Sequence, residues 1–310
     1  MKEDLKWMVK DKQNKKGEKM NKKKSAKEDI VVKKLGILKL GNIASSVLLE
    51  MLLDERADRL DIEVRTISSG AKLQEDSIND AYEVFSKLVF DLIVVATPNA
   101  SLTAPLKIIT KLSESKIPII VLTDILKKET QEVLKEKNIG FLVVKPDAMI
   151  GARREFLDPT EMAIFNADLI KVLSIGGALA AIHQEIDKVL ELITSKNEVF
   201  LPQIILTPTK IVKFAGFANP YAEAKARAAL EIAEQAAKIN TEGCFKINER
   251  SEYIAQVAAG HEMIQIAAKL AEEAREIEKT NNKVRRQPHS YYGEIQDKRL
   301  LKEKPESKYE

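Results

Sequence analysis

The chain has 310 residues and a formal net charge of +3, with 45% apolar and 31% charged residues. This composition is typical of a globular protein with enough apolar material for a core. The chain contains no run of eighteen apolar residues, so the sequence predicts no transmembrane helix. A single cysteine, Cys244, excludes an intramolecular disulfide and a cysteine-based metal cluster, and it fits a reducing, cytoplasmic setting. The three histidines, His183, His261 and His289, are far apart in the sequence and show no metal-ligand spacing.

The first 30 residues form a basic leader. Residues 1–29 contain eleven Lys and six Asp or Glu residues and offer little to bury, so we expect this segment to be disordered. It is either a solubilising tail or the product of an upstream start codon, with Met20 as the second candidate start. Contact with nucleic acid or anionic surfaces is the less favoured alternative. We therefore assign no function to the leader and expect neither a nucleic-acid nor a membrane partner.

From residue 31, apolar strand-like segments alternate with helix-like segments. The predicted strands cover residues 31–40, 62–67, 92–96, 117–122 and 141–144. Strands that alternate with helices of about 10–15 residues predict βαβ units and a parallel sheet. The strands are nearly all apolar, as expected where helices cover both faces of the sheet. We therefore predict a doubly wound α/β domain over residues 31–150.

Loops with Gly or polar residues follow the predicted strands. In a parallel sheet these loops all lie at the carboxyl edge, where open α/β sheets bind ligands. The first loop contains Gly41 and two serines, which suits either an anion site at a helix N-terminus or a plain tight turn. It matches neither the dinucleotide fingerprint nor the P-loop pattern. Asp124 and Asp147 each end a strand, where a carboxylate either pairs with a ring N–H of a ligand or caps a helix.

The stretch 145–159 separates this alternating half from a helical half. It reads Lys-Pro-Asp-Ala-Met-Ile-Gly-Ala-Arg-Arg-Glu-Phe-Leu-Asp-Pro. Charged residues around a Gly and two prolines indicate either a binding site or an interdomain hinge. The two readings are left open at this point.

Residues 151–280 are predicted to form a helical domain. The predicted features, in chain order, are a helix N-cap at Asp158, a break at Gly176-Gly177, one strand at 201–206, an alanine-rich helix from Asn219-Pro220 to Ala237 and a last helix over 252–279. Small residues let helices approach closely, so we expect the alanine-rich helix to be packed between other elements, with a subunit interface as one option. Residues 281–310 are predicted to be a tail that packs back or is partly ordered.

Nine short motifs occur in one order along the chain. They are Lys39–Ile43, Leu52–Asp58, Ser69–Lys72, Pro98-Asn99, Lys145–Pro159, Asn166–Asp168, Asn219–Ala222, Glu242–Phe245 and His261–Met263. Together they resemble the coenzyme F420-dependent methylenetetrahydromethanopterin dehydrogenases of methanogenic and related archaea, over about residues 31–305. The leader lies outside the resemblance.

The resemblance implies a reversible hydride transfer between reduced coenzyme F420 and methenyl-tetrahydromethanopterin. Coenzyme F420, an 8-hydroxy-5-deazaflavin, acts as a dissociable co-substrate, and neither a metal nor a protein base is required. The second ligand is a tetrahydromethanopterin or sarcinapterin derivative. The implied fold is a Rossmann-like α/β domain followed by a helical domain, assembled as a homo-hexamer.

The resemblance also assigns candidate site residues, none of them catalytic or metal-binding. Those for the anionic tail of the deazaflavin are Gly41, Asn42 and Ser45. Those that line the cleft between deazaflavin and pterin are Asn99, Asp124, Lys145 and Asp147, of which the last two are assigned to the substrate. Further substrate candidates are Arg153, Arg154 and His261. The alternatives are salt bridges from the arginines to Glu155 or Asp158, and a packing role for the histidine.

Three departures from the family pattern fall on the predicted binding edge. The third loop reads Pro98-Asn-Ala-Ser-Leu-Thr-Ala-Pro105 where the family has Pro-Asn-Pro-Ala-Ala-Pro-Gly-Pro. Residues 125–127 replace Ala-Pro-Gly, and Ala44 replaces the usual Gly. Because Pro pre-sets the backbone and Gly permits close approach, we expect the third loop to be softer or differently shaped.

The function predicted from the sequence is therefore the F420-dependent dehydrogenase reaction. The alternative is a non-catalytic or regulatory relative that binds one ligand or none, and a third reading is an oxidoreductase with another deazaflavin or folate-type partner. On this basis Asp147→Ala is expected to impair turnover far more than folding.

Overall fold

A computed structural model describes residues 31–54, 59–149, 158–280, 282, 289–296 and 302–303. The expectations for the leader, for Arg153 and Arg154 and for most of the tail lie outside these residues. Every helix and strand discussed below belongs to the described part of the chain.

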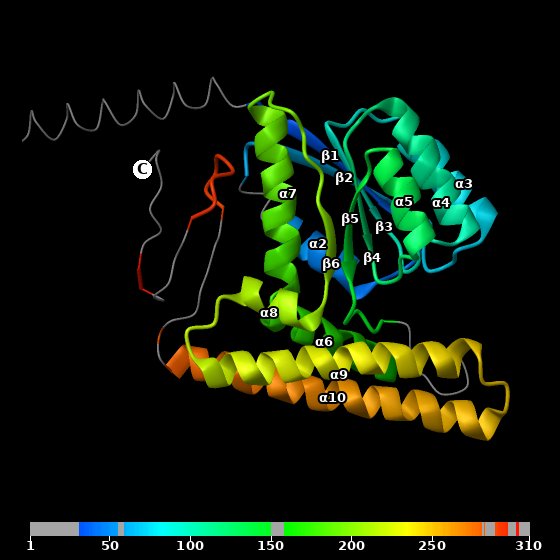
Figure 1. The fold of residues 1–310 in the computed structure, drawn as a ribbon, viewed down its shortest axis with the longest axis vertical. Coiled ribbons are helices and arrows are strands. Elements are labelled where there is room, and N and C mark those ends of the chain that lie inside the picture. Colours follow the sequence, from blue (N-terminus) through cyan, green and yellow to red (C-terminus); the bar gives the residue numbers. More distant parts are fainter. Residues whose placement is uncertain are drawn as a thin grey trace, which may run out of the picture.

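A parallel sheet forms the centre of the fold (Figure 1). Its strands are β1 (Lys33–Lys39), β2 (Ile62–Ser68), β3 (Leu92–Ala96), β4 (Ile119–Thr123), β5 (Gly140–Val144) and β6 (Gln203–Leu206). They lie in the order β2-β1-β3-β4-β5-β6, and each neighbouring pair is parallel. The predicted doubly wound α/β fold is confirmed. The strand order reverses between β1 and β3, which is the switch point where such sheets form a ligand crevice.

Successive strand residues point to opposite faces of the sheet and contact two separate cores. Leu35 and Ile37 belong to the core shared with α2 (Ala44–Asp54) and α7 (Ala178–Thr194). Leu38 and Leu40 belong to the core on the other face. The helices of that face are α3 (Glu75–Phe85), α4 (Thr103–Leu112), which continues into the 3-10 helix η2 (Ser113–Ser115), and α5 (Lys128–Glu136). The helices after β1 and β3 thus leave the switch point toward opposite faces.

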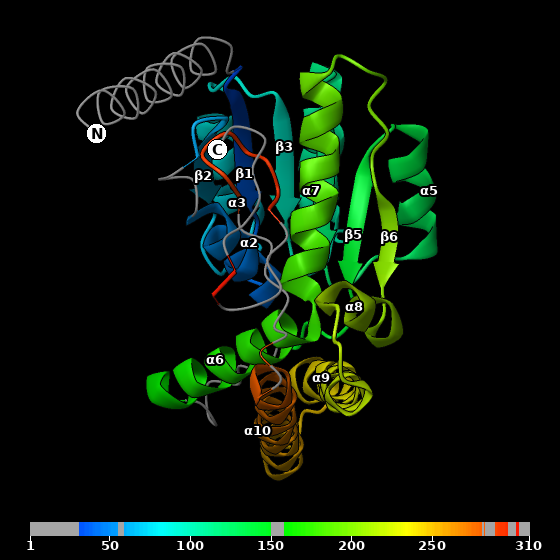
Figure 2. The same ribbon diagram turned by 90° about the vertical axis from the view of Figure 1, so that its left-hand side faces the viewer.

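The second half is mainly helical, as predicted. Its helices after α7 are α8 (Pro208–Ala215), α9 (Pro220–Phe245) and α10 (Arg250–Thr280). Figures 1 and 2 show α9 and α10 side by side beneath the sheet, with α6 (Pro159–Gly176) against them. The buried face of α9 is lined by small side chains, namely Ala222, Ala226, Ala229, Ala233 and Ala236. This small-residue face fits the close helix packing that the alanine-rich sequence predicts.

Two local predictions in this half are confirmed. Asp158 caps α6, with Oδ1 accepting from Thr160 N at 2.7 Å and Glu161 N at 2.9 Å. Gly177 separates α6 from α7 with φ +112°, and a Cβ there would lie 2.5 Å from the Ile211 carbonyl oxygen. Only glycine fits this backbone and this space.

Two features differ from the sequence-based prediction. Helix α8 was not expected, and the predicted strand near residue 201 completes the sheet of the first half beside β5. The domain boundaries at residues 150 and 280 stay a prediction. Among the described helices, no single one is long and apolar enough to cross a membrane. Together, α6 and α7 are long and apolar enough to cross a membrane, by length and composition only, but they are bent by 62° relative to each other.

Candidate functional site

The loops after β1, β2 and β3 meet at the carboxyl edge of the sheet. Gly41 N donates to Ser69 Oγ at 3.2 Å. A Cβ on Gly41 would lie 3.1 Å from Pro98 Cδ, and φ at Gly41 is +81°. The tight turn therefore requires glycine both for its backbone and for the approach of the third loop. The expected convergence of these loops is confirmed.

The third and fourth loops are joined by a network of hydrogen bonds. Asn99 and Ile125 form an isolated parallel bridge. Asn99 Oδ1 accepts from Ser101 N at 3.0 Å, and Ser101 Oγ accepts from Lys127 N at 2.9 Å. Ser101 and Lys127 both lie in segments that depart from the family pattern. The two altered loops therefore support each other through a direct contact.

Asp147, after β5, caps helix α2. Its carboxylate accepts from Ser45 N and Ser45 Oγ, both at 2.7 Å, from Ala44 N at 3.2 Å and from Met149 N at 3.3 Å. The residue is fully buried. Burial raises the pKa of Asp147, although the donors of Ser45, Ala44 and Met149 oppose that rise. The geometry is that of the helix cap, one of the two alternatives left open by the sequence.

This cap bears on the predicted anion site in the first loop. A helix N-terminus favours an anion, and here the anion at α2 is the protein's own Asp147 carboxylate. Ser45 directs both its N–H and its hydroxyl at that carboxylate and is itself buried. The contact of Ser45 with the deazaflavin tail stays a prediction. In the structure, Ser45 binds the Asp147 carboxylate and so holds α2 to the end of β5.

Asp124, after the neighbouring strand β4, is also buried, but one of its two carboxyl oxygens has no partner in the described chain. Its Oδ1 atom has no hydrogen-bond partner among the described residues, and neither has Oγ1 of Thr97 at the end of β3. Burial first, and then the charge of Asp147, raise the pKa of Asp124 well above its ordinary value, and the backbone N–H groups of Asp124 and Ile125 and the charge of Lys145 oppose this only in part. Buried polar atoms without partners are uncommon in folded proteins, and at the carboxyl edge of the sheet they make Asp124 and Thr97 candidates for ligand binding.

The other edge residues are more accessible. Asn42 is exposed, and Asn99 and Lys145 are half-buried. The Lys145 ammonium forms no ion pair within 4 Å with any carboxylate of the described residues, while its backbone N–H donates to the Leu206 carbonyl at 3.1 Å. The edge therefore presents a cation next to the two unpartnered groups, Thr97 and Asp124.

His261 lies in the helical half. It is buried in α10, and its ring stacks on Phe165 of α6 with centroids 4.1 Å apart and an interplanar angle of 22°. This arrangement fits the packing alternative, and its assignment to the substrate stays a prediction. Arg153 and Arg154 lie outside the described residues, so their roles also stay predictions.

The sequence analysis missed two features. Thr97 was seen only as part of a loop, although its place directly after β3 was a usable signal. The histidines have no metal-ligand spacing along the sequence, but the fold brings His183 and His289 together around Asp187. The only signal was the helical i,i+4 spacing of His183 and Asp187, since His289 lies 102 residues beyond Asp187.

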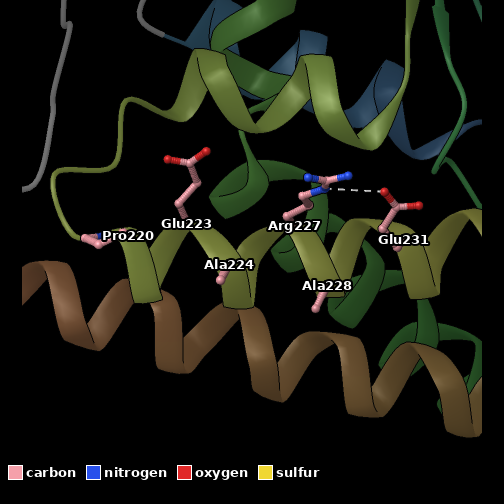
Figure 3. A pocket seen from close by; sticks show the side chains of 6 residues that line it. All are labelled: Pro220, Glu223, Ala224, Arg227, Ala228 and Glu231. Atoms are coloured by element: carbon pink, nitrogen blue, oxygen red, sulfur yellow. Dashed lines mark ion pairs between the residues drawn. The ribbon is translucent and has the colours of Figure 1, made fainter.

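An open hollow of about 500 Å³ lies along α9 (Figure 3). It is lined by Pro220, Glu223, Ala224, Arg227, Ala228 and Glu231. All of these are exposed except the half-buried Ala228, and Arg227 Nε lies 3.6 Å from Glu231 Oε1. One exposed helix face with an internal ion pair lacks the convergent buried polar groups seen at the sheet edge, so the edge is the stronger candidate site.

The sequence profile of methylene-5,6,7,8-tetrahydromethanopterin dehydrogenases matches residues 33–306. The chain belongs to this family. An F420-dependent methylenetetrahydromethanopterin dehydrogenase of Archaeoglobus fulgidus is 49% identical over 276 residues, which are 89% of this chain and 100% of that protein. The enzyme of the same name from Methanocaldococcus jannaschii is 44% identical over 280 residues, with the same two coverages.

A solved structure supports the same assignment. It is an F420-dependent methylene-tetrahydromethanopterin dehydrogenase in complex with methylene-tetrahydromethanopterin and coenzyme F420. It matches with a TM-score of 0.84 at 39% identity and covers 89% of this chain and 100% of its own. The dehydrogenase family inferred from the motifs is therefore confirmed, and the match runs through the altered third and fourth loops.

Proposed function

We propose that the protein is an F420-dependent methylenetetrahydromethanopterin dehydrogenase. It transfers a hydride from reduced coenzyme F420 to the one-carbon bridge of methenyl-tetrahydromethanopterin, which gives methylene-tetrahydromethanopterin, oxidised F420 and a proton, and it also runs in reverse. The observation that carries this proposal is the 49% identity across the full length of the Archaeoglobus enzyme.

The groups at the carboxyl edge suit these two ligands. The pyrimidine ring of a deazaflavin carries an N–H donor and carbonyl acceptors. Asp124 Oδ1 and Thr97 Oγ1 are buried hydrogen-bonding atoms without a partner in the described chain, and they match those ring groups. Both ligands also carry anionic phosphate or carboxylate groups, for which the unpaired ammonium of Lys145 and the exposed amide of Asn42 are suitable partners.

Each of these residues has a task in binding and orientation. Coenzyme F420, when bound, supplies the hydride carrier, and the chain supplies position and exclusion of water. Burial raises the pKa of Asp124, which favours the protonated carboxyl, and in that form the group both donates and accepts a hydrogen bond. Asp147 acts as a positioning residue, since it fixes α2, and with it the Gly41 turn, to the end of β5.

Three finer points belong to the same proposal. They are the homo-hexameric assembly, the cytoplasmic location and the choice between tetrahydromethanopterin and sarcinapterin. All three rest on the family resemblance. Light scattering of the purified protein tests the hexamer, and turnover with each pterin tests the substrate.

The decisive experiment follows the absorbance of oxidised coenzyme F420 mixed with the protein and methylene-tetrahydromethanopterin. We expect loss of the oxidised deazaflavin band only when both protein and pterin are present. Unchanged absorbance, with an active control enzyme in parallel, would contradict the proposal. Separate binding titrations of the two ligands would then identify a non-catalytic relative, which binds one ligand or none.

A further inference from the structure

A second polar cluster lies where α7 meets residues 289–296, here called the C-terminal segment. His183 Nε2 lies 2.8 Å and His289 Nε2 lies 3.0 Å from the same Asp187 oxygen, Oδ2. The two Nε2 atoms lie 2.8 Å apart. The three side chains are only 12%, 14% and 1% exposed for His183, Asp187 and His289. The cluster adjoins Arg59, just before β2, and therefore the amino ends of the strands.

Hydrogen bonding alone accounts poorly for this triangle. A neutral imidazole carries a proton on one ring nitrogen and a lone pair on the other. If both Nε2 atoms are protonated toward Asp187, their two N–H groups crowd at 2.8 Å. If one Nε2 is unprotonated, its lone pair faces either the carboxylate or the other ring. Three convergent donor atoms are arranged more naturally around a cation.

The spacing of the three atoms agrees with metal coordination. A first-row divalent ion binds imidazole nitrogen and carboxylate oxygen at about 2.0–2.2 Å, so neighbouring ligand atoms of an octahedral site lie about 2.9 Å apart. The three separations here are 2.8, 2.8 and 3.0 Å. The atoms thus occupy the positions of one octahedral face, with the remaining positions open to water.

We propose that His183, Asp187 and His289 bind one divalent first-row metal ion, for which Zn²⁺ and Co²⁺ serve as probes. Two imidazoles and a carboxylate form a donor set that such ions accept and that Mg²⁺, which prefers all-oxygen sites, does not. The i,i+4 spacing places His183 and Asp187 on one face of α7, and the C-terminal segment supplies the third ligand.

The surroundings of Asp187 support a ligand role. Arg59 Nη1 lies 3.7 Å from Oδ1, the oxygen that does not face the histidines, and Arg59 is itself held by both oxygens of Asp61 at 2.9 and 2.6 Å. Such outer contacts orient a coordinating carboxylate.

The metal fastens the C-terminal segment to the fold. Among the described residues, Leu60 N donates to the Tyr291 carbonyl at 2.7 Å and so connects the segment to the fold, while the bridge between His289 and Ile295 lies within the segment. A shared ion joins this segment to α7, and the contact of Asp187 with Arg59 connects α7 to the residues before β2. This role is separate from hydride transfer, and an ion that binds only the native state would stabilise it by RT ln(1 + [ion]/Kd).

The test uses the full-length protein stripped with EDTA and titrated with ZnCl₂ in a calorimeter. We expect one Zn²⁺ per chain, a higher Tm with Zn²⁺ than without, and no such response to MgCl₂. His289→Ala and Asp187→Asn are expected to weaken Zn²⁺ binding at least about 10–100-fold. The matched controls are His261→Gln, the remaining histidine, and Glu191→Gln, an exposed carboxylate on the same helix, and both retain binding.

Co²⁺ gives a readout that needs no variant. The stripped parent is expected to develop Co²⁺ visible bands that an equimolar amount of Zn²⁺ abolishes. Failure of the parent to take up stoichiometric Zn²⁺ or Co²⁺ would overturn the proposal, and the cluster would then be a hydrogen-bonded network. Unchanged Zn²⁺ affinity in folded His289→Ala would overturn it as well.

Discussion

The ends of β4 and β5 carry two aspartates that look alike in sequence and differ in structure. Asp147 is fully buried with four hydrogen-bond donors, whereas Asp124, on the neighbouring strand, is 7% exposed and has an oxygen without a partner in the described chain. A satisfied buried carboxylate stabilises the fold, while an unsatisfied one costs stability unless a ligand uses it. The comparison separates a scaffold position from a binding position at one sheet edge.

The largest expected effect is on Asp147. Asp147→Ala removes the cap of α2 and leaves buried N–H groups of Ala44 and Ser45 without an acceptor. We expect the free energy of unfolding to fall by roughly 2–4 kcal/mol, measured by urea denaturation. Asp147→Asn keeps one acceptor oxygen and should lose less. The capping geometry thus reverses the expectation that turnover suffers more than folding, and lost activity with unchanged stability would break the comparison.

Asp124→Asn is expected to act in the opposite way. The amide replaces a carboxyl that is costly to ionise, so stability is retained, while kcat/KM falls about 10–100-fold, which corresponds to about 1.4–2.7 kcal/mol. Steady-state kinetics with F420 and the pterin measure the loss. An equal loss of activity and of unfolding free energy would make Asp124 a second scaffold residue.

The pH dependence of stability sharpens this contrast. The pKa of Asp124 is raised in the folded state, so the folded protein holds a proton that the unfolded chain has released. Its contribution to stability is fully present below its ordinary pKa of 3.8 and is lost as the pH rises through the higher folded pKa. The Asp124→Asn variant has no carboxyl group at this position, so it does not lose this stability as the pH rises. Its advantage in Tm over the parent should therefore be larger at pH 8 than at pH 4.

A smaller effect is expected for Thr97→Val. Valine has nearly the same shape but lacks the buried hydroxyl that has no partner in the described chain. We expect stability to change by less than about 1 kcal/mol and the affinity for one ligand to fall about tenfold. Ligand titrations and thermal melts check the two parts. A large loss of stability would show that the hydroxyl is already satisfied.

The smallest effect is expected at the altered loops. Ser101→Ala removes the hydrogen bond to Lys127 N that joins the third and fourth loops. Because this bond is partly exposed, we expect a cost of about 0.5–1 kcal/mol, with activity retained. A strong loss of activity would show that the departure from the family pattern has taken over a binding task.

The layout of the sheet was predictable, and the partners of its edge residues were not. Strands such as Leu92–Ala96 are short apolar runs between turn residues, so periodicity reveals them. Helix α8 was not predicted because it has only 8 residues, from Pro208 to Ala215, and ends just before Gly216. The contrast between Asp124 and Asp147 was not predicted because two of the donors to Asp147, Ala44 N and Ser45 N, lie 103 and 102 residues away, at the start of α2. The same long-range closure hid the cluster around Asp187.

The pairing of β5 with β6 has a consequence for biosynthesis. β5 is synthesised before α6 and α7, and β6 follows both. Until β6 emerges, β5 is an edge strand, buried on both faces and with free N–H and C=O groups along its side. Such an edge pairs readily with other chains. A nascent chain or fragment that stops near residue 150 is therefore expected to aggregate, and productive folding must wait for residues 203–206.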